Sequence, residues 1–336
     1  MLLRFTHETD LAYTAPINET VMELRMAPRQ EQDQHRLSFR LAIGPTSPVT
    51  GYFDWLGNLV HSFTINSFHE RIRIVATSVV ETHRPWGDPT ALSDRWPIDI
   101  ASLDYGVRDF LRFGGSIVDV PELHALAHSL NAKPGMLLGE LAMSMLRVID
   151  ERFVYQQGVT TATSPITEVL QHRTGVCQDF AHLMIGLGRA LGIPARYVSG
   201  FLHPEGERYR GYTQTHAWCE LYFPSVGWVG FDPTNKCMIS AHFVRVAVGR
   251  DYRDVPPNRG MFKGVSKESM EVVVQSEELP QVPSGLPAER IEGLGIRTVN
   301  GENGSARDGN NQQISQQQQQ AKNATIQQHQ QQQQQQ

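Results

Sequence analysis

Three short segments of the chain carry the residue types of one thiol-based active site, and they constrain the fold most. They read TGVCQDF at 174–180, THAW at 215–218 and GFDPT at 230–234. The pattern predicts that Cys177 opens a helix, His216 starts a strand and Asp232 ends the next strand. A fold that unites them must place a helix tip against one end of a sheet, which favours an α+β class.

The helix that follows Cys177 has a clear apolar face. Its apolar residues recur at spacings of three and four, at Phe180, Leu183, Met184, Leu187 and Leu191, as on one side of an α-helix. The Gly-Ile-Pro sequence at 192–194 predicts its end. Counting back three residues from Phe180 places Cys177 in the first turn, on the buried side. The partial positive charge of a helix N-terminus favours the thiolate there.

The segments 196–201, 216–223 and 228–231 read as consecutive strands, with 243–248 and 270–274 expected to complete the same sheet. The short connection at 225–227 makes the second and third strands an antiparallel pair. His216 and Asp232 then lie at one end of the sheet. We expect Asp232 to accept the Nδ1 proton of His216 and leave Nε2 for the thiol. The Cys177 N–H is the expected oxyanion donor. No second donor is evident in the sequence.

The remaining organisation is predicted from composition and periodicity. Residues 1–85 alternate apolar and polar, as at Met22, Leu24 and Met26, and the WLGN sequence at 55–58 indicates a hairpin turn. We expect a β-rich, sandwich-like domain that acts as scaffold or shapes the substrate site. Residues 86–134 form a linker and helical segment, with helices expected to begin at Pro121 and Pro134. The core occupies 135–276.

Residues 277–336 are expected to be disordered. Apolar residues thin out there, and glutamine runs occupy 316–320 and 330–336. Such a segment cannot bury enough apolar area to offset an ordering cost of ~1–2 kcal/mol per residue. A role of this tail in assembly stays open.

Charge and cysteine content narrow the classes of function. A net charge of −5 gives no electrostatic reason to expect nucleic acid or an anionic membrane as a partner. Three cysteines in 336 residues make no disulfide framework, which indicates a reducing compartment. The N-terminus has no secretory pattern and no segment is apolar enough to span a bilayer. A cytoplasmic location is therefore expected.

Other candidate residues favour structural roles. His124 and His128 have the spacing of a zinc pair but lack the neighbouring glutamate of a metalloprotease helix, so a surface pair is preferred. His182 lies about 140° around the helix from the thiol and reads as a structural hydrogen bonder. Alternation turns Cys219 away from His216, which indicates packing, and Cys237 reads as an inert or redox-sensitive bystander.

Taken singly, Cys177, His216 and Asp232 would each more often be structural than catalytic. Together with their flanking residues they resemble the transglutaminase-like superfamily, in particular a bacterial branch of candidate cysteine proteases. The resemblance runs from about 138 to 236 and is strongest in RTGVCQDFAHL at 173–183, LGIPARYVSG at 191–200, HAW at 216–218 and GWVGFDPTN at 227–235. The β-rich first domain is similar to the N-terminal region of that branch.

The resemblance implies a papain-like α+β core in which a helix bearing the cysteine packs on an antiparallel sheet. It implies that Cys177 is the nucleophile, His216 the general base and acid, and Asp232 the residue that orients the histidine. No cofactor or metal is expected, because no acidic cluster resembles the calcium sites of animal transglutaminases. Cys219 departs from the family, which usually has an aliphatic residue there.

These observations predict an enzyme that cleaves a peptide or amide bond through a thioester. Hydrolysis by a protease or amidase is favoured. Transamidation at protein glutamine, and a non-catalytic peptide-binding or assembly protein, remain as alternatives. The expected partner is a peptide or protein substrate, and the sequence does not define the oligomeric state.

Overall fold

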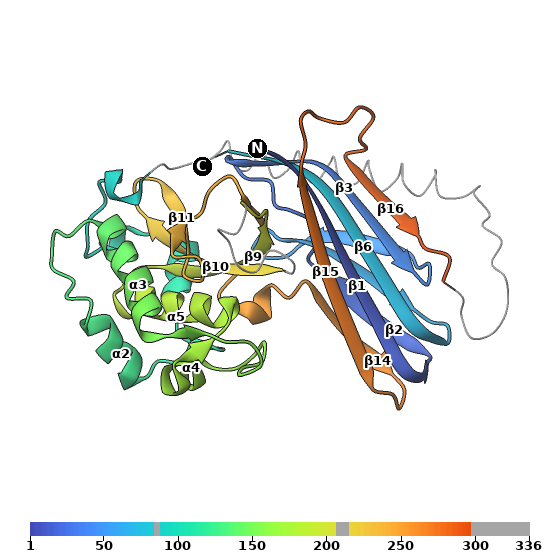
Figure 1. Ribbon diagram of the computed structural model, residues 1–336, viewed down its shortest axis with the longest axis horizontal. Coiled ribbons are helices and arrows are strands. Elements are labelled where there is room, and N and C mark those ends of the chain that lie inside the picture. The colour runs from blue at the N-terminus through green and yellow to red at the C-terminus, as the bar shows by residue number, and fades with distance from the viewer. Residues whose placement is uncertain (84–87, 206–214, 297–336) are drawn as a thin grey trace. The chain divides into compact units, whose positions relative to one another are not determined.

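The computed structural model describes residues 1–83, 88–205 and 215–296. They fall within one compact unit, Met1–Val299, built of a β-sandwich and a mixed α+β core (Figure 1). The α+β class and the β-rich first domain are as predicted. No helix in these ranges has both the length and the apolarity needed to cross a membrane.

The sandwich consists of two sheets whose facing sides are apolar. One has the order β15-β1-β6-β3-β16 and the other β14-β2-β5-β4. Period-two alternation puts Leu11, Phe39 and Ile74 of the first sheet in one buried cluster with Met22 and Phe63 of the second. The strands from the N-terminal region are β1 (Leu2–Ile17), β2 (Glu19–Leu24), β3 (Gln34–Gly44), β4 (Val49–Phe53), β5 (Leu59–Ile65) and β6 (His69–Thr82).

The hairpin predicted at 55–58 joins β4 and β5, which pair antiparallel. Asp54 N–H donates to the Asn58 carbonyl at 3.0 Å, closing the loop. Gly57 has φ +74°, a left-handed conformation that glycine adopts without strain.

Three strands from the C-terminal part of the chain return to the sandwich, contrary to the prediction. They are β14 (Asn258–Lys263), β15 (Glu268–Glu278) and β16 (Glu289–Gly293). Residues 270–274 do not complete the core sheet, because β15 pairs antiparallel with β1. Structure also continues past 277, where disorder was expected, since β16 pairs in parallel with β3. The glutamine runs lie outside the described residues.

The core places helices against a five-stranded sheet of order β12-β11-β10-β9-β13. Its strands are β9 (Ala195–Leu202), β10 (His216–Phe223), β11 (Gly227–Asp232), β12 (Cys237–Met238) and β13 (Phe243–Gly249). The helices are α1 (Tyr105–Arg108), α2 (Pro121–His128), α3 (Leu138–Arg152), α4 (Ile166–His172) and α5 (Cys177–Ala190). Short 3-10 helices occupy Pro89–Ala91, Ile100–Ser102, Asp109–Leu111 and Tyr252–Asp254, and β7 (Val154–Tyr155) pairs with β8 (Thr174–Gly175).

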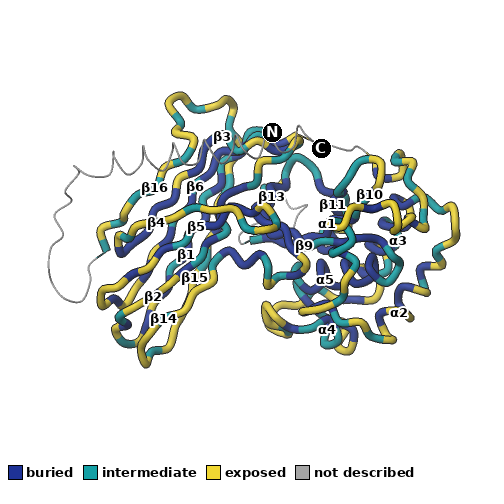
Figure 2. The backbone as a smooth tube through the Cα atoms, turned by 180° about the vertical axis from the view of Figure 1, so that it is seen from behind, coloured by how far each residue is buried: buried dark blue, intermediate teal, exposed yellow. Residues whose placement is uncertain are grey.

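Helix α5 lies at the centre of the core. Figure 2 shows that most of α5 is buried, as are β9 and β10. Leu183 and Leu187 of α5 share one apolar cluster with Cys219 and Leu221 of β10. Helix α2 begins at Pro121 as predicted. Helix α3 begins at Leu138, four residues after the predicted start at Pro134.

A second apolar cluster joins the sandwich to the core sheet. Phe5 of β1 stacks on Phe201 of β9 with ring centroids 5.0 Å apart. Val244 and Val246 of β13 lie in the same cluster, together with Val80 of β6. The sheet that carries His216 therefore packs against helix α5 and against the N-terminal domain.

Candidate active site

Cys177 is the first residue of α5, as its sequence context predicts. The preceding residue is fixed by a side chain of the same helix, because Val176 N–H donates to Asp179 Oδ2 at 2.8 Å. Thr160 Oγ1 donates to the same carboxylate oxygen at 2.6 Å. Gly175 is required by this close approach, since a Cβ there would lie 2.7 Å from the Asp179 side chain. The thiol is thus carried at a helix start, where the first backbone N–H groups have no partner within the helix itself.

His216 is the first residue of β10 and is almost completely buried. Its neighbours Ala217 and Cys219 pack in the cluster that contains α5. Alternation along the strand therefore turns His216 to the opposite face, where its ring lies 6.2 Å from that of Trp218. This confirms that Cys219 faces away from His216, with its side chain in packing contacts.

The structure brings His216 and Asp232 together, with Nε2 of His216 2.7 Å from Asp232 Oδ2. The predicted ring orientation is wrong, because Nε2 faces the carboxylate and Nδ1 does not. Nδ1 is buried and makes no ordinary hydrogen bond to any described residue. The Cys177 thiol interacts with the same ring, and Nδ1 is the nitrogen left for it.

Asp232 is held by the turn that follows it. Its Oδ1 accepts from the backbone N–H of Thr234 at 2.9 Å and of Asn235 at 3.3 Å, and its Oδ2 accepts from Asn235 Nδ2 at 2.6 Å. Asn235 was missed as a site residue by sequence reasoning, although the Asp-Pro-Thr-Asn order is typical of a turn closed by an aspartate side chain. These donors fix the carboxylate that orients the imidazole.

The charge of Asp232 dominates the electrostatics of the site. Burial alone would lower the pKa of His216, but the charge and hydrogen bond of Asp232, with a further contribution from Cys177, raise it from 6.5 to about 10. The imidazole is therefore charged at neutral pH. An imidazolium beside a thiol favours the thiolate, which is the reactive form of cysteine.

Two other candidates have structural contacts. Nε2 of His182 accepts from Tyr252 N–H at 3.1 Å, as the prediction of a structural hydrogen bonder requires, and burial lowers the pKa of His182 to about 4. His124 lies on the surface with Nε2 2.6 Å from Asp119.

The two remaining cysteines lie on strands of the core sheet, Cys219 in β10 and Cys237 in β12. Burial raises the pKa of Cys219 well above its usual value, so this thiol stays protonated and inert. Cys237 is half-buried and lies opposite Asp232 in the β11–β12 pair. Among the described residues no His, Cys, Asp and Glu side chains gather into a group of three or more that could hold a metal ion.

Family models and relatives agree with this architecture. The transglutaminase-like superfamily model matches residues 124–233, and the model of the bacterial transglutaminase-like N-terminal region matches 3–81. An uncharacterized protein of Mycobacterium leprae is 30% identical over 286 residues, which cover 82% of this chain and 99% of that protein. The chain belongs to the transglutaminase-like superfamily, in its bacterial form with an N-terminal β-rich region.

Two further proteins are similar to the chain. A candidate cysteine protease from Cytophaga hutchinsonii, solved by crystallography, has the same fold, with a TM-score of 0.65 at 22% identity over 84% of this chain and 93% of that one. A protein-glutamine gamma-glutamyltransferase of Pseudomonas aeruginosa is 34% identical over 124 residues, which cover 34% of this chain and 18% of that enzyme. The second likeness is confined to part of each chain.

Proposed function

We propose that the protein is a cysteine-dependent acyl-transfer enzyme that acts on peptide or amide bonds, with Cys177, His216 and Asp232 as its catalytic residues. The observation that carries the proposal is the buried His216–Asp232 contact of 2.7 Å beside the helix that begins at Cys177. Membership of the transglutaminase-like superfamily supports it.

In the first step, the thiolate of Cys177 attacks the carbonyl carbon of the substrate amide. The Cys177 N–H at the start of α5 is placed to donate to the developing oxyanion, an interaction worth roughly 3–4 kcal/mol where it has been measured. The C–N bond then breaks, and His216 gives its proton to the leaving amine. The product is an acyl thioester on Cys177. Asp232 keeps the ring oriented and stabilises its charged form.

In the second step, water or an amine attacks the thioester, His216 accepts the proton, and Cys177 is released as the thiolate beside the charged ring. We favour water as the acceptor and therefore a protease or amidase, because water reaches an open thioester without a dedicated binding site. Transamidation of protein glutamine is the second candidate, favoured by the relative from Pseudomonas aeruginosa that is named a protein-glutamine gamma-glutamyltransferase.

The nucleophile can be tested with iodoacetamide at graded pH. Peptide mass spectrometry reports each cysteine separately, so the half-buried Cys237 and the buried Cys219 serve as internal controls. We expect Cys177 to be alkylated well below pH 7 and to lose this reactivity in the His216→Ala variant. Labelling of Cys177 no different from that of Cys237 would falsify the enzymatic proposal and favour a non-catalytic peptide-binding protein.

The acceptor can be tested with a peptide library incubated with and without a primary amine. Cleavage adds water across a peptide bond, deamidation adds water and releases ammonia, and transamidation adds the amine and releases ammonia, so the three mass changes differ. The Cys177→Ala variant is the matched control. Products in the absence of amine support hydrolysis, and products formed only with amine overturn it in favour of transamidation.

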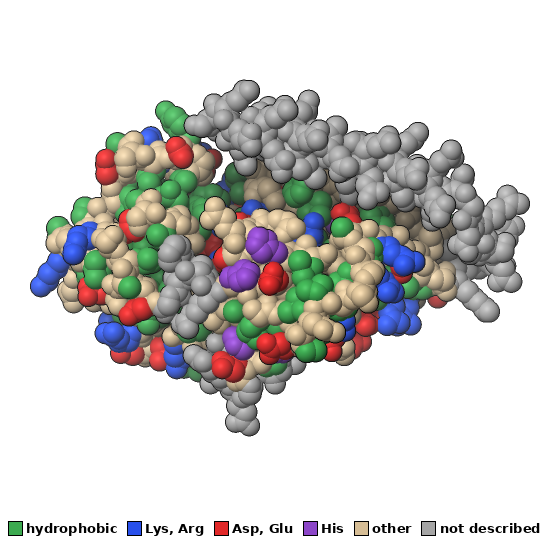
Figure 3. Space-filling model, turned by 90° about the horizontal axis from the view of Figure 1, so that it is seen from above, with side chains coloured by type: hydrophobic (Ala, Val, Ile, Leu, Met, Phe, Trp, Pro, Cys, Tyr) green, Lys and Arg blue, Asp and Glu red, His purple; other side chains and the backbone are tan. Residues whose placement is uncertain are grey.

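We infer a reducing, cytoplasmic setting and a peptide or protein partner in place of nucleic acid or membrane. Three cysteines without a disulfide support the first inference. The second is supported by the net charge of −5 and by the face drawn in Figure 3, where basic and acidic side chains of the described residues are interspersed.

A further inference from the structure

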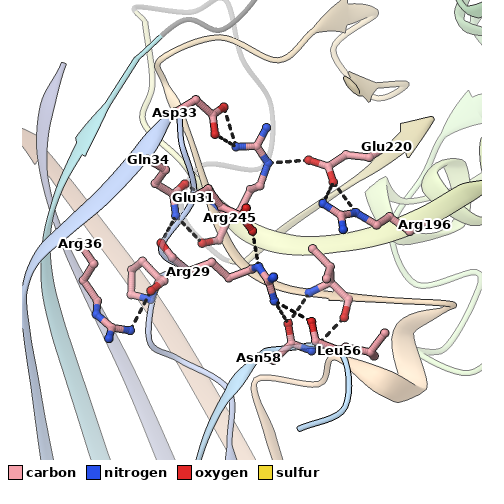
Figure 4. Close-up of polar contacts among 12 residues, drawn as sticks. Arg29, Glu31, Asp33, Gln34, Arg36, Leu56, Asn58, Arg196, Glu220 and Arg245 are labelled. Carbon is pink, nitrogen blue, oxygen red and sulfur yellow. Dashed lines mark hydrogen bonds and ion pairs between the residues drawn. The ribbon is translucent and has the colours of Figure 1, made fainter. Parts of the chain in front are cut away.

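A buried chain of charged side chains links the N-terminal domain to the strand that carries His216 (Figure 4). It starts at Glu220, four residues after His216 in β10 and on the same face of the strand. Glu220 is completely buried, and each of its carboxylate oxygens has its own arginine. Arg196 reaches Oε2 at 2.6 Å, and Arg245 bonds to Oε1.

The second partner of Arg245 comes from the N-terminal domain. Arg245 Nη1 donates to both oxygens of Asp33, at 2.8 and 3.0 Å. The backbone of Arg245 is held from the same segment, because Gln34 Oε1 accepts from Arg245 N–H at 2.7 Å and Gln34 Nε2 donates to the Arg245 carbonyl at 2.9 Å. Arg29 N–H donates to that carbonyl as well, at 3.0 Å.

Arg245 and His216 belong to one row across the core sheet. Arg245 of β13 pairs with Gly200 of β9, and Gly200 pairs with His216 of β10. The row is tightly packed, because a Cβ on Gly200 would lie 2.2 Å from the Val244 carbonyl oxygen and 2.3 Å from the Trp218 ring. A shift of β13 at Arg245 would therefore move the strand end that presents His216.

Burial makes this cluster sensitive to the loss of any one charge. Arg196 and Arg245 outweigh the effect of burial and hold the pKa of Glu220 at about 2, so the carboxylate is ionised at neutral pH. Two carboxylates, Asp33 and Glu220, face two arginines. A buried charge that loses its partner is strongly unfavourable.

We propose that Asp33 and Gln34 of the N-terminal domain are positioning residues for the active site, acting through Arg245 on His216. The N-terminal domain is then part of the catalytic apparatus, beyond any role in handling substrate. This inference rests on the proposed function. It concerns how His216 is held relative to Cys177, and neither Asp33 nor Gln34 touches the reacting atoms.

The test compares Asp33→Asn with a matched control, Asp10→Asn. Asp33 is one-fifth exposed, and asparagine keeps its size, so the fold should tolerate the change. Asp10 makes an ion pair with Arg71 on the surface of the same domain, so its variant loses an equivalent charge away from the core sheet. Both proteins are assayed by the rate of Cys177 alkylation from pH 5 to 9, with thermal unfolding measured in parallel.

We expect the Asp33→Asn variant to be folded and to alkylate Cys177 at pH 6 at least tenfold more slowly than the wild type. The Asp10→Asn variant should match the wild type. Asp33→Glu keeps the carboxylate and should restore most of the rate. Gln34→Ala removes two hydrogen bonds to the Arg245 backbone without changing charge, and should lower the rate in the same direction.

The outcomes separate this inference from the proposed function. If wild-type Cys177 reacts only as an ordinary thiol, the proposed function fails. If wild-type Cys177 is reactive at pH 6, and folded Asp33→Asn and Gln34→Ala variants retain that reactivity while their melting temperatures fall, the cluster is merely structural. The positioning role is then overturned while the enzyme assignment stands.

Discussion

Replacing Asp232 with asparagine should remove the charge that keeps the buried ring of His216 protonated. In the wild type the pKa of His216 rises from 6.5 to about 10, which corresponds to on the order of 5 kcal/mol in favour of the charged ring, at 1.36 kcal/mol per pKa unit. Asparagine keeps the shape but supplies no charge. Because burial lowers the pKa, the ring should be neutral at pH 7 in the Asp232→Asn variant.

This change has a defined pH signature. A group whose pKa is raised on folding contributes stability that is fully present below its unfolded pKa, here 6.5, and is lost as the pH rises through its folded pKa, here about 10. The difference in unfolding free energy between wild type and Asp232→Asn should therefore be largest below pH 6.5. It should shrink as the pH approaches 10.

Urea unfolding at several pH values measures that difference, and nitrogen-detected histidine NMR reports the charge of the ring directly. Asp119→Asn is the control, because Asp119 contacts His124 at the same kind of distance, 2.6 Å, on the exposed surface. Exposed pairs contribute about 1 kcal/mol or less, so this variant should stay close to the wild type. A wild-type His216 that titrates near 6.5, or a stability gap that does not change between pH 6 and 10, would refute the reasoning.

Three further predictions concern the packing around the site. Gly200→Ala should lower stability by about 1–3 kcal/mol or more in thermal unfolding. The control is Gly106→Ala, whose added Cβ would have no neighbour within 4 Å and which should be neutral or slightly stabilising. Equal effects of the two substitutions would contradict the close packing around Gly200. Glu220→Gln should cost roughly 3–5 kcal/mol at pH 7, because it removes the negative charge that pairs with Arg196 and is shared with Asp33 by Arg245. Because the pKa of Glu220 is lowered from 4.5 to about 2, the cost of the substitution should decrease as the pH falls below 4.5 and vanish below about 2. A cost that stays constant down to pH 2 in urea titrations would refute this prediction. Asp179→Ala should cost about 1 kcal/mol by removing the bond to the helix start and should slow alkylation of Cys177; an unchanged alkylation rate would show that the thiol does not depend on this bond.

The helix and strands that carry the site could be predicted because their signals are local. The apolar spacing after Cys177 specifies the buried face of α5, and the alternation after His216 specifies the two faces of β10. Cys177 at the start of α5 and His216 at the start of β10 can therefore be placed from their own segments, without knowledge of the tertiary contacts of these elements.

The ring orientation of His216 could not be predicted, because both nitrogens can accept or donate and the sequence does not show which one faces Asp232. Sheet membership of the last strands failed for a similar reason. Alternation in β15 predicts a half-buried strand, and it does not say which of two sheets provides the partner. The short β16 has a single large apolar residue, Ile291, so composition alone did not distinguish it from the tail.

The return of β15 to pair with β1 has a consequence for biosynthesis. Strand β1 is synthesised long before its partner at 268–278. The core, by contrast, is contiguous in the chain and can acquire its helices and sheet earlier. A nascent chain therefore exposes one edge of β1 until residues 268–278 have been made, and a fragment cut anywhere before Asn258 keeps that edge open to self-association.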